Sequence, residues 1–122
     1  MFEQFKAMGA IAALMKDKDR LRQQVEEFKE KTASISVTGS AGGGAVRVTV
    51  SGQLRVTGVQ LDPALVAGLQ HGDGGRTMAQ VLIADAVNDA MGKAQAMVHE
   101  EADRRARDLG LPGLPGLTSM LG

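Results

Sequence analysis

Apolar positions recur with a helical period at both ends of the chain and with the period of a strand in its middle. From about Phe2 to Lys31 there is no proline, and apolar side chains return at intervals of three, four and seven residues, which predicts a helix with one face against another surface. At ~1.5 Å per residue, about 30 residues form a rod of roughly 45 Å, whereas a strand of about six residues covers only ~20 Å. We therefore expect part of this helix to project or to pair with a second helix. Its apolar stripe consists of Ile11, Leu14, Leu21, Val25 and Phe28.

The middle of the chain alternates apolar and polar residues, which predicts strands. The first strand starts at Ile35 and the second covers Val46–Val50. A flexible hairpin connection at Gly39–Gly44 should separate them, and Ser51–Gly52 marks a turn into a third strand, Leu54–Leu61. Strands joined in this way form an antiparallel meander.

The apolar positions of the third strand change parity, from Leu54 and Val56 to Val59 and Leu61. A regular strand cannot place both pairs on one face, because a shift of one residue moves every side chain to the opposite face. A β-bulge near Thr57–Gly58 would restore them to one face, and glycine tolerates a bulge well. We predict this bulge, and unbroken pairing there would contradict it.

A short helix is predicted directly after the strands. Asp62 stands where an N-cap acceptor belongs, Pro63 where the first helical residue belongs, and Gly68 where a short helix would end. The polar, glycine-rich stretch His71–Arg76 that follows is expected to be a loop.

The last long helix is predicted to open at Thr77 and to run to about Leu109, because Thr77 and Gln80 have the spacing of a capping box. Its stripe is rich in small side chains, so its axis can approach the sheet or the first helix closely. A glycine inside a helix costs about 1 kcal/mol relative to alanine, so we expect Gly92 to serve close packing, with a solvent-facing glycine as the alternative. The stripe consists of Ile83, Val87, Ala90, Ala94, Met97 and Val98.

Together these elements predict an α+β fold in the order α-β-β-β-α: a long N-terminal helix, a three-stranded antiparallel meander, a short helix and a long C-terminal helix. A chain of 122 residues makes one domain, which we place at residues 1–109. Two prolines and repeated Gly-Leu steps preclude a helix beyond it, so residues 110–122 are expected to form a flexible tail with a few apolar anchors. With no Trp or Tyr and three Phe, the core must be aliphatic, and we expect stability to need a partner surface.

Composition and charge limit the cellular compartments and the kinds of binding partner that we expect for this chain. The chain has no cysteine, which excludes disulfides and Cys-ligated zinc and indicates an intracellular, reducing compartment. The apolar stretch Ala7–Met15 fits a helix better than a secretory signal, because Glu3 precedes it and alternating charges follow it. It is also far shorter than the about 20 apolar residues that cross a bilayer, so no membrane partner is expected. The formal net charge is zero, so any DNA contact must come from local patches rather than from a global positive field.

No set of residues forms a recognisable catalytic or metal site. The glycine run Gly39–Gly44 leads into a strand rather than through Gly-Lys-Ser/Thr into a helix, so it is a hairpin and not a phosphate loop. Asp85 and Asp89 lie four apart, but no third carboxylate or histidine has an obvious route to the same point, and the structural alternative is an Asp89–Lys93 ion pair. The serines have no histidine near in sequence to form a nucleophile pair. We therefore expect no enzyme activity, no metal and no cofactor.

Two groups of basic residues are the candidate binding surface. The first group forms two i,i+4 pairs that present like charges on neighbouring strips of the first helix, although Asp17 and Asp19 reduce the net charge of this segment to two. Either a solvated helical face or a phosphate contact explains such a run. The second group lies near the C-terminal end of the last helix, where the negative end of the helix dipole stabilises cations. Glu100 and Glu101 stand four residues before Arg104 and Arg105, which is the spacing of ion pairs within a helix. The sequence leaves open whether the groups merge. They comprise Lys16, Lys18, Arg20 and Arg22, and Arg104, Arg105 and Arg107.

Three segments in a fixed order resemble the YbaB/EbfC family of nucleoid-associated proteins. They are Leu61-Asp62-Pro63-Ala64-Leu65, then Asn88-Asp89-Ala90 inside a helical stretch, then Gly-Leu-Pro-Gly-Leu-Pro-Gly-Leu from Gly110 to Leu117. With the long first helix and the glycine-rich step into Val46, the resemblance covers nearly the whole chain. Each segment alone is weak, whereas their order and spacing together are fairly specific.

The resemblance implies a homodimer in which α-helices project from a central β core like the arms of tweezers. It also implies DNA binding in the bacterial cytoplasm or nucleoid, often with limited sequence specificity. We therefore expect double-stranded DNA as a partner and the seven cations named above as its contacts. The zero net charge and the acids among the basic residues predict weak DNA binding that is lost quickly as salt rises. Each phosphate contact contributes about 0.9 to the slope of log affinity against log salt concentration.

The alternative hypothesis is a dimeric protein-protein interaction adaptor with little intrinsic DNA affinity. It would dock another protein through the projecting helix and the leucine-rich tail, and the zero net charge favours it. The apolar tail residues are Leu111, Leu114, Leu117 and Met120.

Overall fold

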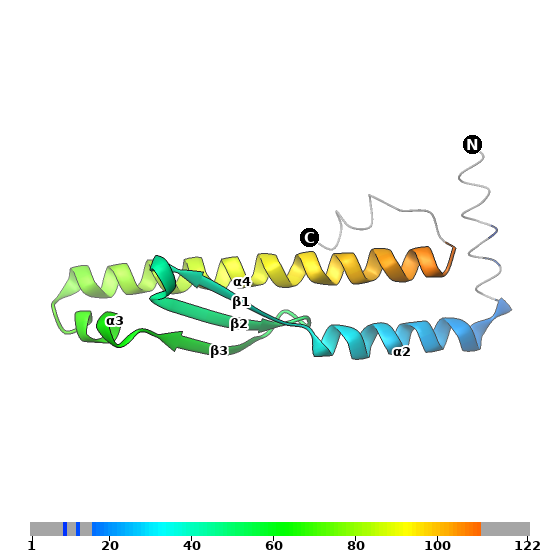
Figure 1. Ribbon diagram of the computed structural model, residues 1–122, viewed down its shortest axis with the longest axis horizontal. Helices are drawn as coiled ribbons and strands as arrows, with labels where there is room; N and C mark the ends of the chain where they lie inside the picture. Colours follow the sequence, from blue (N-terminus) through cyan, green and yellow to red (C-terminus); the bar gives the residue numbers. More distant parts are fainter. Residues whose placement is uncertain (1–8, 10–11, 13–15, 111–122) are drawn as a thin grey trace, which may run out of the picture. The chain divides into compact units, whose positions relative to one another are not determined.

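A computed structural model of the protein describes residues 9, 12 and 16–110 (Figure 1). The elements have the predicted order and make an α+β fold. The chain divides into two compact units, which we call the two-helix unit (described residues up to Ala33 and from Met97) and the sheet unit (Ser34–Ala96). The elements are α2 (Lys18–Ser34), β1 (Ser36–Ala41), the 3-10 turn η1 (Gly42–Gly44), β2 (Val46–Ser51), β3 (Val56–Leu61), α3 (Pro63–Gly68) and α4 (Asp73–Asp108).

The strands form the predicted antiparallel meander, in the order β1-β2-β3. Between β2 and β3 the register shifts, because Thr49 faces Gly58 while Val50 faces Val56, so that Thr57 is an extra residue. The predicted bulge is confirmed. It brings the apolar residues of β3 opposite those of β2, and directly opposed residues of an antiparallel pair share a face. The opposed pairs are Val56 with Val50, Val59 with Val48, and Leu61 with Val46.

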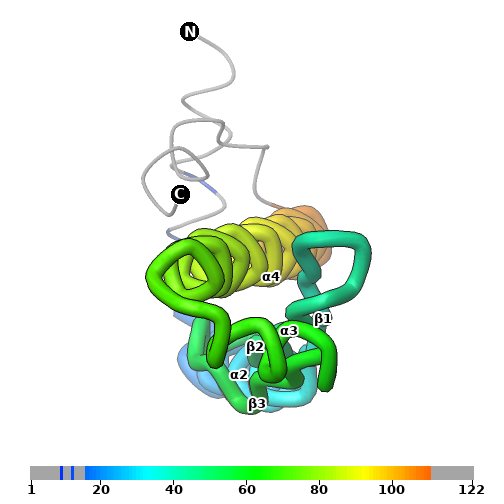
Figure 2. The backbone as a smooth tube through the Cα atoms, turned by 90° about the vertical axis from the view of Figure 1, so that its left-hand side faces the viewer, coloured from blue at the N-terminus to red at the C-terminus, as the bar shows by residue number. Residues whose placement is uncertain are grey.

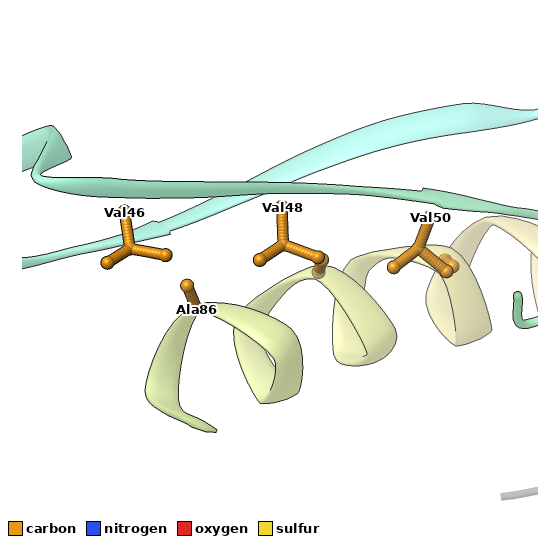
Figure 3. Packing of buried hydrophobic residues seen from close by; sticks show 6 residues of the cluster. Val46, Val48, Val50 and Ala86 are labelled. Carbon is orange, nitrogen blue, oxygen red and sulfur yellow. The ribbon is translucent and has the colours of Figure 1, made fainter. Parts of the chain in front are cut away.

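In the sheet unit, α4 covers one face of the sheet (Figure 2), and small side chains of α4 pack against the valines of β2 (Figure 3). The valines of β2 point toward α4 and have no exposed surface. Gly39 of β1 is also buried, and a Cβ atom there would lie 2.3 Å from the backbone nitrogen of Ala90. Glycine and alanine thus allow strand and helix backbones to touch. The fully buried cluster is Val46, Val48, Val50, Ala86, Ala90 and Ala94.

The prediction of one unbroken helix from Phe2 to Lys31 is wrong at Asp17. Asp17 is not helical, and its Oδ1 accepts a hydrogen bond from the backbone N–H of Arg20 at 3.1 Å. A short carboxylate in this position satisfies a backbone donor that the first turn leaves free, so it starts a new helix rather than continuing the old one. Most of the segment before Lys16, with Ile11 and Leu14 of the predicted stripe, lies outside the described residues.

Two strand boundaries also differ from the prediction. Gly39–Ala41 belongs to β1 rather than to the hairpin connection, because Gly39 is needed where β1 meets α4. Leu54 precedes β3 and has a φ of 60°, in the left-handed region that a turn uses. The connection from β2 to β3 is therefore longer than the predicted Ser51–Gly52 turn.

Helix α3 follows its prediction, since Asp62 Oδ1 accepts from the backbone N–H of Ala64 at 2.8 Å and Pro63 is its first residue. Helix α4, by contrast, begins at Asp73 and not at Thr77. The Thr77 hydroxyl donates to the carbonyl oxygen of Asp73 at 2.9 Å, inside the helix. Of the glycines that suggested a loop, Gly75 serves close approach, because a Cβ atom there would lie 2.2 Å from the carbonyl oxygen of Gly68, whereas Cβ atoms on Gly72 and Gly74 would meet nothing within 4 Å.

The predicted packing role of Gly92 is wrong, and the solvent-facing alternative is right. Gly92 is exposed, and a Cβ atom there would have nothing within 4 Å. Met97 of the predicted stripe is likewise 43% exposed. The predicted tail, apart from Gly110, lies outside the described residues. In the described part of the chain, no helix combines the length with the apolarity that crossing a membrane requires.

Candidate nucleic-acid interface

In the two-helix unit, α2 and the end of α4 lie side by side in opposite directions (Figure 1). Arg20 Nη2 donates to the carbonyl oxygen of Asp108 at 3.4 Å, and Glu27, two turns later in α2, accepts from Arg105 Nη1 at 2.6 Å. The start of α2 therefore meets the end of α4. The two basic groups, whose proximity the sequence left open, lie at the same end of this unit.

Six of the seven predicted cations are exposed at this end, and we call them the cationic end. Four exposed carboxylates, those of Asp17, Asp19, Asp103 and Asp108, stand among them, so six cations leave a local excess of two charges. Long, flexible stems let lysine and arginine reach outward from a helix surface while the shorter aspartates stay close to the backbone. The cationic end comprises Lys16, Lys18, Arg20, Arg22, Arg104 and Arg107.

Arg105, the seventh cation, faces into the two-helix unit. Its side chain is 21% exposed and pairs with Glu27 of α2. It also donates from Nε to Glu101 at 2.9 Å and from Nη1 to Gln24 at 3.2 Å. Glu101, only 5% exposed, pairs with Arg104 as well. The predicted i,i+4 pair of Glu101 with Arg105 is confirmed, and Arg105 joins the two helices, which sequence spacing within one helix could not reveal.

An apolar groove lies between the same two helices. It holds about 240 Å³ and its polar lining is Gln24 and Arg105, which are hydrogen-bonded to each other. Apolar side chains from both α2 and the end of α4 line it. Val25 in this lining is 43% exposed, so the predicted stripe of the first helix is only partly covered by α4. The apolar lining is Leu21, Val25, Phe28, Ala102, Ala106 and Leu109.

The Asn88-Asp89-Ala90 triplet lies in the sheet unit and fastens β1 to α4. Asp89 Oδ2 accepts from the backbone N–H of Ser40 at 3.0 Å and from Lys93 Nζ at 3.2 Å. The hydrogen bond from Ser40, together with the hydrogen bond and the charge of Lys93, holds the pKa of Asp89 below its usual value. The predicted Asp89–Lys93 pair is confirmed. Among residues 9, 12 and 16–110, no group of three or more His, Cys, Asp or Glu side chains is arranged to hold a metal ion.

Strand β3 leaves apolar side chains uncovered. Val56, Val59 and Leu61 are 44%, 49% and 38% exposed, although they share the face on which α4 buries the valines of β2. β3 is also an edge strand of the sheet in the described residues. An exposed apolar edge strand of this kind offers unpaired backbone groups and apolar surface to another chain.

Known proteins resemble this chain over most of its length. The sequence model of the YbaB/EbfC DNA-binding family matches residues 8–109. A nucleoid-associated protein of Xanthomonas campestris pv. campestris (strain B100) is 35% identical over 109 residues, which make up 89% of this chain and 94% of that protein. A nucleoid-associated protein of Rhodococcus erythropolis (strain PR4 / NBRC 100887) is 38% identical over 108 residues, covering 87% and 92% of the two chains.

A solved structure has the same fold. The crystal structure of an uncharacterized protein from Helicobacter pylori aligns with a TM-score of 0.60 and 21% sequence identity, covering 73% of this chain and 88% of that one. At this identity the likeness concerns the fold alone.

Proposed function

Because the chain belongs to the YbaB/EbfC DNA-binding family, we propose that it is a nucleoid-associated protein that binds double-stranded DNA through the cationic end. One observation carries the choice of surface: Arg20 of α2 reaches the last carbonyl group of α4, so both basic groups meet at one end of the two-helix unit. Relatives at 35% and 38% identity are named nucleoid-associated proteins, which supports the nucleoid as the site of action.

Phosphates are the part of DNA that this surface suits. Lysine and arginine side chains on the outside of a helix contact phosphate oxygens, and such contacts position a protein without reading bases. The carboxylates among the cations lower the number of effective contacts and therefore the affinity. We infer weak, salt-sensitive binding with little sequence preference.

We assign direct phosphate contacts to the six exposed cations and a positioning role to Arg105. Its guanidinium is held by Glu101, Glu27 and Gln24, so turning it toward DNA would break these bonds and leave Glu101 buried with Arg104 alone. Through these bonds Arg105 keeps α2 beside α4, and thereby keeps the two basic groups together.

We further propose that the protein acts as a homodimer in which a second copy covers β3. A single helix covers β2 but leaves Val56, Val59 and Leu61 more than a third exposed on the same face, which suits an apolar surface contributed by another copy. Two copies would carry two cationic ends. Linked contacts raise affinity by effective concentration, which offsets the weakness of each.

The experiment that tests this function compares two double variants with equal loss of charge. Lys18→Gln with Arg22→Gln removes two cations of the cationic end, and Arg47→Gln with Arg55→Gln removes two exposed cations of the sheet unit. With a fluorescent duplex of arbitrary sequence at low salt, the first variant should bind at least about tenfold more weakly, since losing two contacts also lowers the salt slope by about 1.8. The second should bind nearly as the wild type does.

Equal weakening by both variants would mean that net charge, not this surface, governs binding. If the first variant binds DNA as the wild type does, the cationic end is not the DNA-binding site. The elution volume of each variant in size-exclusion chromatography checks that neither change alters the assembly.

A further inference from the structure

We propose that the segment formed by residues 111–122 binds in cis in the apolar groove of the two-helix unit, with leucines of its repeat as the anchors. The segment lies outside the described residues. Three features support this place: the lining of the groove, the point where the chain leaves α4, and the spacing of the leucines in the segment.

The groove adjoins the start of the segment. Leu109 is the last residue that lines the groove, and Gly110 follows it directly. Gly110 has a φ of 77°, and its N–H donates to the carbonyl oxygen of Arg107 at 3.0 Å. A glycine in the left-handed region ends a helix and turns the chain away from the helix axis. The segment therefore begins two residues after a residue that lines the groove.

The segment repeats with a period that suits an extended ligand. Leu111, Leu114 and Leu117 recur every third residue, and Pro112 and Pro115 follow the first two of them. A residue before proline is pushed toward the extended, polyproline II region. Polyproline II has three residues per turn, which places every third side chain on one side of the strand. The leucines then form a single apolar edge.

The repeat also matches the groove in length and in polarity. Successive leucines of a polyproline II strand are about 9 Å apart at ~3.1 Å per residue, and the groove wall from Ala102 to Leu109 is about 10 Å long at ~1.5 Å per residue. Two leucines can therefore be seated together. The segment has no charged side chain, so seating it brings no charge against the apolar wall. The hydrogen-bonded pair of Arg105 and Gln24 offers polar atoms to the backbone of the strand.

Occupation of the groove by its own chain would cover Val25 and its neighbours in the free protein and add a third element to the helix pair that carries the cationic end. Because this concerns only the two-helix unit, it is independent of whether DNA binds.

Paramagnetic relaxation in NMR tests the proposal on the full chain. The protein has no cysteine, so Thr118→Cys provides a single site for a nitroxide label near the end of the repeat. In ¹⁵N-labelled protein that carries the label, amide signals of Leu21–Phe28 and Ala102–Leu109 should be broadened, and reduction of the nitroxide should restore them. The signals of α3 serve as the internal reference.

Two further variants of the labelled protein separate the leucines from the rest of the segment. Leu111→Ser with Leu114→Ser should abolish the broadening in α2, while Gly113→Ala with Gly116→Ala, which changes the sides of the strand away from the leucines, should retain it. Broadening that survives the loss of both leucines would overturn the proposed anchors.

A mixed sample decides between cis and trans. It combines ¹⁵N-labelled protein without nitroxide and unlabelled protein with nitroxide, and no broadening of Leu21–Phe28 is expected. Broadening in the mixture would place a second copy's segment in the groove, and no broadening in either sample would leave the groove to another occupant, such as a partner protein. Either result overturns the proposal.

Discussion

Gly39 and Gly92 show how differently two glycines can serve the same helix. A Cβ atom on Gly39 would meet the backbone of Ala90 at 2.3 Å, whereas a Cβ atom on Gly92 would meet nothing within 4 Å. The first glycine lets β1 touch α4, because backbone atoms cannot move aside as the end of a flexible side chain can. The second only weakens the helix.

Alanine substitutions at these two positions should therefore have opposite effects. Gly39→Ala is expected to lower the free energy of unfolding by about 3 kcal/mol through overpacking, and Gly92→Ala to raise it by about 1 kcal/mol through helix propensity. Urea unfolding followed by circular dichroism, at one fixed protein concentration, measures both. A Gly39→Ala protein as stable as the wild type would contradict the contact between β1 and α4.

Ionisation of Asp89 makes the stability of the sheet unit depend on pH, with a sign that follows from its lowered pKa. Its pKa in the folded protein is below its usual value, mainly because the Ser40 N–H donates to it and secondarily because of Lys93. The ionised carboxylate therefore stabilises the folded state at a pH above the unfolded pKa, and this contribution is lost as the pH falls through the folded pKa.

The melting temperature as a function of pH checks this dependence. Asp89→Asn should melt lower than the wild type at pH 7, by a difference that is constant above about pH 5 and shrinks at more acidic pH. Lys93→Gln should keep part of the wild-type dependence, since it retains the largest single cause, the Ser40 hydrogen bond. A difference between wild type and Asp89→Asn that grows toward acid would contradict the account.

Between elements, Arg105 makes hydrogen bonds to both Glu27 and Gln24 of α2 from the end of α4. Arg105→Met keeps the apolar stem but leaves Glu101, 5% exposed, with Arg104 as its cation. Breaking a buried pair costs about 3 to 5 kcal/mol, and because Arg104 remains we expect about 3 kcal/mol. Arg104→Met removes a cation whose side chain is 55% exposed and should cost under about 1 kcal/mol. Urea unfolding of the two variants distinguishes them, and equal losses would refute the positioning role of Arg105.

Local sequence signals were sufficient for most of the elements. The change of parity in the third strand predicted the bulge at Thr57, and Asp62-Pro63 predicted the start of α3. The failures came where a residue acts through a distant partner. The sequence does not distinguish the roles of Gly39, Gly75 and Gly92. In the structure Gly39 contacts the backbone of Ala90, Gly75 contacts the backbone of Gly68, and Gly92 has open space where a Cβ atom would lie.

The same limit applies to the candidate interface. The Glu101–Arg105 pair could be predicted, because it depends on spacing within one helix, whereas the i,i+4 relation of Lys16 to Arg20 is interrupted by the break at Asp17. Spacing could not place Glu27 and Gln24 beside Arg105, nor Arg20 beside Asp108, since these contacts join residues about 80 or more positions apart. The separation of Arg105 from the other six cations follows from those contacts alone.

For the whole molecule, β3 is the proposed interface between the two copies of the homodimer. Val59→Lys places a charge in the middle of the exposed apolar row of β3 and should convert a dimer to a monomer, because a charge at an edge strand opposes pairing. Sedimentation equilibrium measures the mass, and Gln60→Lys, on the opposite face of the same strand, is the matched control. A wild-type protein that stays monomeric at high concentration would contradict the homodimer.

The proposed function requires that a protein with zero net charge binds DNA phosphates with one localised set of cations. The most direct test is fluorescence anisotropy of wild-type protein with two duplexes of unrelated sequence, titrated at several salt concentrations between about 50 and 200 mM. We predict similar affinities for both duplexes and a linear decrease of log affinity with log salt, with a slope between about −2 and −5 for each cationic end engaged, since each phosphate contact contributes about 0.9. Absence of binding to either duplex at the lowest salt, or binding that does not weaken as salt rises, would contradict the claim.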